Sequence, residues 1–198
     1  NAKKPDLVAV TGDMVTSGTA FHSDIAELLG ELEAKDGVCV AMGNHDYFGD
    51  GEPLASLLRD KGVRVLRNDG WVVERDGARL YVAGVDDNWS KRDDVEKALA
   101  SRRAGDTTVL LAHDPSMFAE ARRAGVELTL SGHTHGGQVA MPFFAKKISL
   151  AQLTHEHFLG LYRGGKSAIY VNAGLGTTGP PLRLGVPPEI AVLVLRAA

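Results

Sequence analysis

Four apolar segments of the chain each end in a group of polar side chains, and this repeated arrangement constrains the fold more than any other feature of the sequence. The segments are residues 6–10, 37–42, 107–112 and 126–130, and each has the length and aliphatic content of a buried strand. The carboxyl ends of parallel strands in an α/β sheet meet at one edge, where such sheets place their sites. The polar side chains are therefore expected to lie close together.

These polar side chains are of the kinds that bind divalent metal ions. Asp13 follows the first segment, Asn44, His45 and Asp46 follow the second, His113 follows the third, and His133 and His135 follow the fourth. A glycine stands beside three of the four groups and lets the backbone bend so that neighbouring side chains can face one point. Carboxylate, amide and imidazole ligands without a thiolate indicate Mn, Fe, Zn or Ni in a hydrolytic site, not a structural cysteine-zinc site.

The remaining segments predict helices first and hairpins later. Helical spacing predicts helices over 22–34 with Ser23 as N-cap, 53–61, 91–103 and 115–125. Strands are expected at 63–66, in hairpins 71–75 with 79–85 and 158–163 with 167–172, and at 190–195. This mixture favours an α/β fold of two packed sheets covered by helices over a single doubly wound sheet.

Composition indicates one domain and excludes some classes of partner. The chain has 198 residues, of which 44% are hydrophobic, enough for one substantial core. Its 22 basic and 25 acidic residues are well mixed, which argues against binding duplex nucleic acid through a basic face. A single cysteine, Cys39, excludes an intramolecular disulfide. Neither the compartment nor the oligomeric state is indicated.

The chain resembles the calcineurin-like metallophosphoesterase superfamily along essentially its whole length. The resemblance rests on four motifs in their usual order: Gly12-Asp13, Gly43-Asn44-His45-Asp46, His113, and Gly132-His133-Thr134-His135. The longer stretch Gly132 to Gln138, with Asn172 to Gly176 and Pro187 to Ile190, is similar to a bacterial branch associated with membranes or the cell envelope. The resemblance implies an α/β/β/α sandwich of two mixed sheets flanked by helices. It also implies a dinuclear centre whose metal-activated hydroxide hydrolyses a phosphomonoester, phosphodiester or pyrophosphate.

The resemblance assigns a role to each matching residue. Asp13 is the carboxylate that bridges the two metal ions, and Asn44, His113 and His133 complete one metal site. His135 belongs to the other metal. His45 occupies the position of the leaving-group acid or of a group that stabilises the transition state. Asp46 is expected to hold the tautomer and orientation of His45, with a local turn-forming role as the alternative.

One departure from the superfamily puts the second metal in doubt. Its members begin with a strand ending in Asp-X-His, which supplies ligands to the metal that His135 shares, and no such motif precedes Asp13. Shortening, omitted residues and a true one-metal variant are the competing explanations. We expect a single domain over 1–198 that lacks its first strand. We favour shortening or omission over evolved loss, because loss of that strand would leave an exposed sheet edge, which proteins normally avoid. As written, the chain is expected to hold one metal and to show weak or no activity.

Two further segments suggest contacts with a substrate or a membrane. Arg183, in a loop rich in Gly and Pro, is a candidate to grip a substrate phosphate bidentately, with an ordinary surface arginine as the alternative. Met141 to Phe144 and the lysines that follow suggest an interfacial wedge for a lipid-linked phosphate, or else a flap over the core. His155 and His157 are interpreted as loop residues. The expected partner is a phosphorylated small molecule or a lipid-linked phosphate.

Two other classes of function remain open. The absent Asp-X-His allows a catalytically impaired fold that acts as a metal-binding or protein-binding scaffold, although a scaffold has no need of His45. A different His-X-His hydrolase, an amidohydrolase or a metallo-β-lactamase-like enzyme, is disfavoured. The first would carry the pair on its first strand, and the second would continue into Asp-His, whereas Gly136 and Gly137 follow here.

Overall fold

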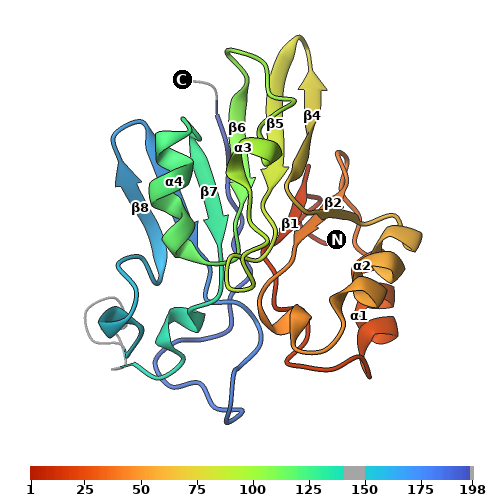
Figure 1. Cartoon of the computed structure of the whole chain (residues 1–198), viewed down its shortest axis with the longest axis vertical. Coiled ribbons are helices and arrows are strands. Elements are labelled where there is room, and N and C mark those ends of the chain that lie inside the picture. Colours follow the sequence, from red (N-terminus) through yellow and green to blue (C-terminus); the bar gives the residue numbers. More distant parts are fainter. Residues whose placement is uncertain (141–149, 197–198) are drawn as a thin grey trace.

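The structure, a computed structural model, describes residues 1–140 and 150–196. The interfacial wedge expected at Met141 to Phe144 lies outside the described residues. Two sheets form the centre of the molecule, and helices cover their outer faces (Figure 1). None of the helices described is long and apolar enough to cross a bilayer.

The first sheet has three parallel strands in the order β1-β2-β3. They are β1 (Val8–Val10), β2 (Val38–Ala41) and β3 (Arg64–Leu66). Helices α1 (His22–Gly30) and α2 (Gly51–Asp60) pack on its outer face, where Ala26, Leu54 and Leu58 are fully buried against β2. Asp50 starts α2 two residues earlier than predicted, because its carboxylate accepts the N–H of Glu52 (3.1 Å).

The second sheet has six strands in the order β4-β5-β6-β7-β9-β8. They are β4 (Asp69–Arg75), β5 (Ala78–Gly84), β6 (Thr107–Leu111), β7 (Leu128–Ser131), β8 (Gly160–Gly164) and β9 (Ser167–Val171). The inner four are parallel, and β4 and β8 are antiparallel edges. Helices α3 (Val95–Ala98) and α4 (Phe118–Arg123) cover its outer face (Figure 1). Both predicted hairpins are confirmed.

The core between the sheets joins them into one sandwich. Cys39, Ala41 and Leu66 of the first sheet pack against Val82, Val109 and Leu111 of the second. The α/β/β/α fold expected from the resemblance is therefore confirmed, with apolar layers on both sides of each sheet. The described residues also include four short 3₁₀ turns: η1 (His45–Tyr47), η2 (Pro115–Met117), η3 (His135–Gly137) and η4 (Leu150–Leu153).

The helix predicted over 91–103 is much shorter than expected, and only α3 is formed. Backbone N–H groups before α3 donate to partners outside the predicted helix. The N–H of Arg92 donates to the Asp87 carbonyl (2.9 Å), and that of Asp94 donates to Asn68 Oδ1 (2.9 Å). Asp94 then caps the helix by accepting the N–H of Lys97 (2.8 Å). Tertiary hydrogen bonds therefore override the helical pattern of this segment.

Two other predictions about element ends are wrong. Helix α1 starts after Phe21 without a side-chain cap, so Ser23 is not its N-cap, and it ends at Gly30 because Glu31 is already the C-cap residue. Residues 190–195 form no strand with any described segment, and Ile190 and Val194 are largely exposed. Aliphatic composition alone does not make a strand when no partner strand lies beside it.

Candidate metal centre

Site residues from both sheets converge at the carboxyl ends of the strands, the lower end of the molecule in Figure 1. Asp13 and Asn44 follow β1 and β2 of the three-stranded sheet, and His113 and His133 follow β6 and β7 of the six-stranded sheet. Ligand atoms of Asp13, His113 and His133 all lie within 4.8 Å of one another. The sequence-based expectation that these strand ends meet is confirmed for these three residues.

The hydrogen bonds of His113 show why this triad suits a cation. Its Nδ1 lies 2.7 Å from the Thr11 carbonyl oxygen, which makes Nδ1 the protonated nitrogen. Its Nε2 lies 3.1 Å from Oδ2 of Asp13 and 3.1 Å from Nδ1 of His133. With both imidazoles neutral, Nε2 of His113 presents a lone pair toward the Asp13 carboxylate, and Nδ1 of His133 adds a second in the tautomer that carries its proton on Nε2. A proton or a metal ion must sit among them, and two imidazoles with one carboxylate form a common ligand set for a divalent ion.

The pKa shifts agree with this arrangement. Burial by itself lowers the pKa of His113, but the adjacent Asp13 carboxylate outweighs it and raises the pKa above its usual value. Burial likewise favours a higher pKa for Asp13, and His113 reverses the direction, so that the pKa of Asp13 is lowered. Burial and the neighbouring His113 lower the pKa of His133 to about 4. His133 therefore offers a free lone pair at neutral pH.

Asn44 provides an independent sign of an unfilled ligand position. Its side chain is buried, and its Oδ1 has no hydrogen-bond partner among the described residues. A buried acceptor left without a partner costs about 1–3 kcal/mol, so such atoms normally have one. An amide oxygen, added to a carboxylate and two imidazoles, would complete a donor set that fits a divalent metal. The assignment of Asn44 as a ligand stays a prediction.

The backbone around the triad is strained and tightly packed. Asp13, His133 and His135 have positive φ angles of 54°, 67° and 50°, which are uncommon for non-glycine residues. Gly12 and Gly43 let the β1 and β2 loops touch, since a Cβ on Gly12 would lie 2.6 Å from the Gly43 nitrogen. These glycines therefore allow the close approach that places Asp13 next to His113.

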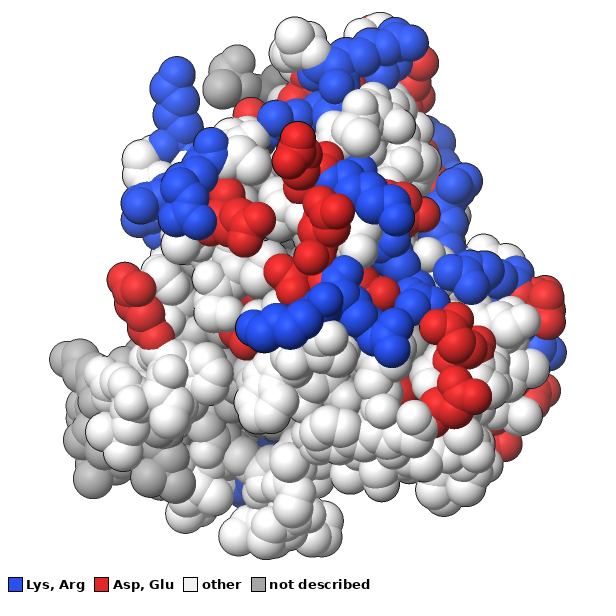
Figure 2. Space-filling model, viewed as in Figure 1, with Lys and Arg blue, Asp and Glu red and all other residues white. Residues whose placement is uncertain are grey.

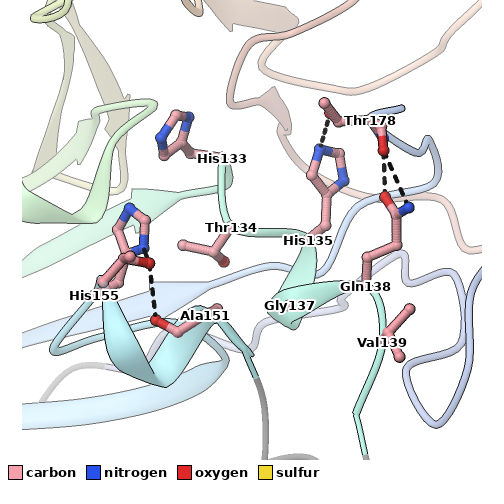
Figure 3. Close-up of a pocket in the computed structure, with 10 residues that line it drawn as sticks. His133, Thr134, His135, Gly137, Gln138, Val139, Ala151, His155 and Thr178 are labelled. Atoms are coloured by element: carbon pink, nitrogen blue, oxygen red, sulfur yellow. Dashed lines mark hydrogen bonds between the residues drawn. The ribbon is translucent and has the colours of Figure 1, made fainter. Parts of the chain in front are cut away.

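His135 lies apart from the triad. Its Nε2 is 2.9 Å from the Thr178 hydroxyl and its Nδ1 is 3.5 Å from Nη2 of Arg183. Figure 3 shows the two imidazoles of the His-X-His pair on opposite sides of the loop, with His135 facing Thr178. Burial and Arg183 lower the pKa of His135, which keeps its ring neutral. Its role as a ligand of a second metal stays a prediction.

Asp46 does not hold His45 in the way that the sequence suggested. Its carboxylate accepts backbone N–H groups of Asp13 (3.0 Å), Met14 (2.7 Å) and Gly43 (2.8 Å), and so ties the β1 loop to the β2 loop. The Nδ1 of His45 lies 2.7 Å from the Thr16 carbonyl instead. Burial raises the pKa of Asp46 to about 6, so the acceptor form is still the main one at neutral pH. The alternative of a local turn-forming role fits these contacts.

Arg183 uses two of its guanidinium nitrogens for backbone carbonyls. Its Nε donates to the Gly176 carbonyl (3.0 Å), and its Nη2 donates to the carbonyls of Ala173 (2.7 Å) and Gly174 (3.1 Å). Nη1 is buried and has no partner among the described residues. The guanidinium therefore organises the loop beside His135, and its role in binding a substrate phosphate stays a prediction.

A cavity of about 380 Å³ opens beside the triad, and His155 is one of its walls. The other lining side chains include His133, Thr134, His135, Gln138 and Thr178 (Figure 3). The rings of His155 and His133 are 5.5 Å apart, whereas the ring of His157 packs on Phe118 and Tyr162. His155 is a loop residue, as expected, and its side chain also lines this cavity. The second His-X-His was the available signal, but its placement depends on how η4 packs against η3.

Comparisons with known proteins agree with this geometry. A family model described as calcineurin-like phosphoesterase matches residues 1–137. The chain is 35% identical to the uncharacterized metallophosphoesterase YkuE of Bacillus subtilis, over the whole of this chain and 70% of that one. It is 34% identical to an uncharacterized metallophosphoesterase of Helicobacter pylori strain J99, over 98% of this chain and 52% of the relative.

A vertebrate protein and a solved structure also match. A Danio rerio protein named "Transmembrane protein with metallophosphoesterase domain" is 36% identical over the whole of this chain and 47% of its own length. The chain thus spans about half the length of several relatives. The structure of Haemophilus influenzae NAD nucleotidase has a TM-score of 0.53 at 16% identity, over 83% of this chain and 39% of that one, which supports the fold.

Proposed function

The chain belongs to the calcineurin-like phosphoesterase family, and from this premise we propose that its site hydrolyses phosphoesters at a dinuclear divalent-metal centre. Family membership makes it a metal-dependent phosphoester hydrolase in general terms. The observation that carries the proposal is the convergence of lone pairs from Asp13, His113 and His133 on one point. A binding protein without metal chemistry would have no need for that convergence.

Each ligand has a definite place in the proposal. Asp13, Asn44, His113 and His133 hold one ion, and Asp13 and His135 face the second. Mn, Fe, Zn and Ni all suit this set of oxygen and imidazole donors. Divalent ions in such a site supply Lewis acidity, which stabilises charge on the phosphoryl oxygens and makes hydroxide available near neutral pH.

Backbone groups orient the residues that do the chemistry. The N–H of His45 donates to Oδ1 of Asp13 (2.9 Å), and the Thr11 carbonyl fixes His113, so both ligands are held before any ion binds. The Thr16 carbonyl engages Nδ1 of His45. This leaves Nε2 of His45, which carries a proton in the imidazolium form of the ring, as the atom that would give that proton to the leaving oxygen of the phosphoester.

The cavity between His133 and His135 takes the rest of the substrate. Its volume of about 380 Å³ lies within the usual range for small-molecule sites, roughly 300–1,000 Å³. The substrate in this proposal is a phosphorylated small molecule or a lipid-linked phosphate. Since the Danio rerio relative is named a transmembrane protein, association with a membrane also belongs to the proposal.

Hydrolysis of bis-p-nitrophenyl phosphate and p-nitrophenyl phosphate, measured with Mn²⁺, Fe²⁺, Zn²⁺ and Ni²⁺ in turn, tests the proposal. We expect turnover that depends on the metal and disappears with a chelator. Metal content measured on the same samples separates two failures. A chain that binds metal but hydrolyses neither ester with any of the four ions contradicts the enzyme and favours the scaffold alternative.

His45→Ala tests the mechanism within the same assay. The variant should keep its metal and lose turnover, most strongly for esters with poor leaving groups, because these need the proton most. Loss of metal from His45→Ala would make His45 a ligand instead of the acid.

A further inference from the structure

Four large apolar side chains are exposed on segments that contact the candidate metal centre or line its cavity. They are Phe48, Trp89, Leu153 and Leu175, with 49%, 63%, 84% and 63% of their surfaces exposed. We call this set the apolar rim. Single exposed apolar residues are common on proteins, but a group of large ones around a site marks a surface that contacts something apolar.

Each member of the apolar rim is tied to a residue of the site. The ring of Phe48 lies 4.6 Å from that of His45, and the indole of Trp89 lies 6.2 Å from the ring of His133. Leu153 is the last residue of η4, and Ala151 of the same turn and Thr154 directly after it line the cavity. Leu175 lies between the two glycines whose carbonyls bind Arg183 next to His135. Phe48 and Trp89 therefore lie against residues of the site, and Leu153 and Leu175 lie on segments that adjoin it.

Trp89 is held in solvent by an ordered turn. The buried Asp87 accepts the N–H of Trp89 (3.1 Å) and the N–H of Ser90 (2.9 Å). Nδ2 of Asn88 donates to Oδ2 of Asp114 (3.3 Å), which anchors the same turn beside the site. The backbone of Trp89 is therefore held in place, and most of the indole surface is in water, where a ligand can reach it.

The charged side chains lie elsewhere on the face in view. Figure 2 shows Lys, Arg, Asp and Glu concentrated over the strands and outer helices, whereas the lower end, where the strand ends and the site lie, carries few of them. A substrate with several further charges, such as a nucleoside polyphosphate or a phosphopeptide, would find few partners there. An uncharged aliphatic group fits that surface better.

We propose that the site takes amphiphilic phosphoesters, with the phosphoester at the Asp13, His113 and His133 triad and an aliphatic chain across the apolar rim. This inference rests on the proposed function, because it names the substrate class of the same site. Burial of the chain against Trp89, Phe48, Leu153 and Leu175 supplies the binding free energy that the sparse charges of this end do not.

A series of p-nitrophenyl alkyl phosphates tests the inference, because the leaving group stays constant while the alkyl chain grows from methyl to butyl to octyl. Each ester is kept below the concentration at which it aggregates. KM should then fall by up to about fourfold for each methylene that the rim buries, with little change in kcat. In Trp89→Ser this dependence on chain length should weaken markedly. Leu161→Ser, a matched change at an exposed leucine of β8 outside the rim, should preserve it.

Binding of octyl phosphate and ethyl phosphate, followed by tryptophan fluorescence, separates failure of the inference from failure of the proposed function. The sequence has two tryptophans, so the emission of Trp89→Ser comes from Trp71 and is subtracted as background. We expect octyl phosphate to change the Trp89 emission and to bind more tightly than ethyl phosphate. Equal KM values across the esters together with equal binding of the two phosphates overturn the inference and assign the rim to another occupant, such as a protein. If no ester is hydrolysed with any metal, the proposed function fails, and the fluorescence comparison alone decides the inference.

Discussion

Nε2 of His113 lies 3.1 Å from Oδ2 of Asp13, and this contact joins the two sheets. Asp13 follows β1 of the three-stranded sheet, and His113 follows β6 of the six-stranded sheet. The Thr11 carbonyl, again from the β1 end, holds the other nitrogen of the same imidazole at 2.7 Å. A metal ion bound at this point would therefore bridge the two halves of the sandwich, so metal binding and fold stability are coupled.

Asp13→Asn should abolish this coupling. In the unchanged chain, a divalent ion at a hundred times its Kd should raise the free energy of unfolding by about 2.7 kcal/mol, because it binds the folded state. The variant loses the charge that faces both imidazoles, so its metal content and its metal-dependent rise in Tm should both drop. Thermal unfolding with and without chelator, together with elemental analysis, measures this. Asp60→Asn, at an exposed aspartate of α2, serves as the control, and equal metal in both variants would remove Asp13 from the ligand set.

Gly43→Ala should damage the site through the backbone. A Cβ at Gly43 would lie 2.6 Å from the Asp13 nitrogen and 2.8 Å from Nδ1 of His113, and neither atom can move without disturbing the triad. Overpacking of this kind costs about 1–3 kcal/mol. We expect a lower urea midpoint and weaker metal binding. Gly176→Ala, where an added Cβ meets nothing within 4 Å, should leave the urea midpoint nearly unchanged. Equal midpoints for the two variants would contradict the tight contact.

The parts of the fold that sequence predicted well are those determined by local pattern. β6 is an aliphatic run that is buried on both faces, and the hairpin around Asp76 and Gly77 carries its own turn signal. The segment at 91–103 has an equally clear helical pattern, but Asp87 and Asn68 bind its backbone, and only α3 forms. Such long-range hydrogen bonds leave no trace in a local pattern.

The same distinction applies to the site. His113 and His133 follow neighbouring parallel strands, so sheet geometry predicted that they meet, whereas Asp13 follows a strand of the other sheet and reaches them through the packing of the two sheets. His155 and Arg183 lie on irregular segments, and their contacts depend on how those segments fold over η3. Their roles therefore became visible only in the structure, one as a wall of the cavity and the other as an organiser of a loop.

His155→Ala should weaken substrate binding without loss of metal. The Thr154 hydroxyl donates to the Ala151 carbonyl (3.3 Å), so it accepts from Nδ1 of His155 (2.8 Å) and leaves Nε2 of His155 to interact with a phosphoester in the cavity. We expect KM for bis-p-nitrophenyl phosphate to rise several-fold, with a smaller change in kcat. His157→Ala removes the neighbouring imidazole, which packs on Phe118 and Tyr162 outside the cavity, and should leave KM unchanged. A similar KM for both variants would contradict a role for His155.

Arg183→Lys should loosen the loop beside His135. A lysine ammonium cannot reproduce the planar fork whose Nε and Nη2 bind carbonyls of residues 173, 174 and 176. Amide hydrogen exchange over 173–176 should become faster, and the free energy of unfolding should fall by about 1–2 kcal/mol. Arg163→Lys, at an exposed arginine of β8, provides the control. Unchanged exchange in Arg183→Lys would show that the carbonyls do not depend on the guanidinium.

Cys39 should be unreactive in the folded protein, and its titration should lower the free energy of unfolding at alkaline pH. The thiol is fully buried in β2, and burial raises its pKa from 9.0 to about 12. Between these values the folded chain keeps a proton that the unfolded chain releases, so the free energy of unfolding falls as pH rises from 9 toward 12, by at most about 1.4 kcal/mol per pH unit. Lysines and tyrosines titrate in the same range, so the quantity to measure is the difference between the unchanged chain and Cys39→Ala in urea unfolding at several pH values.

Thiol labelling at pH 8 gives a second measurement, because one thiol should react quickly in denaturant and very slowly without it. Fast labelling of the folded chain would contradict the buried position of Cys39.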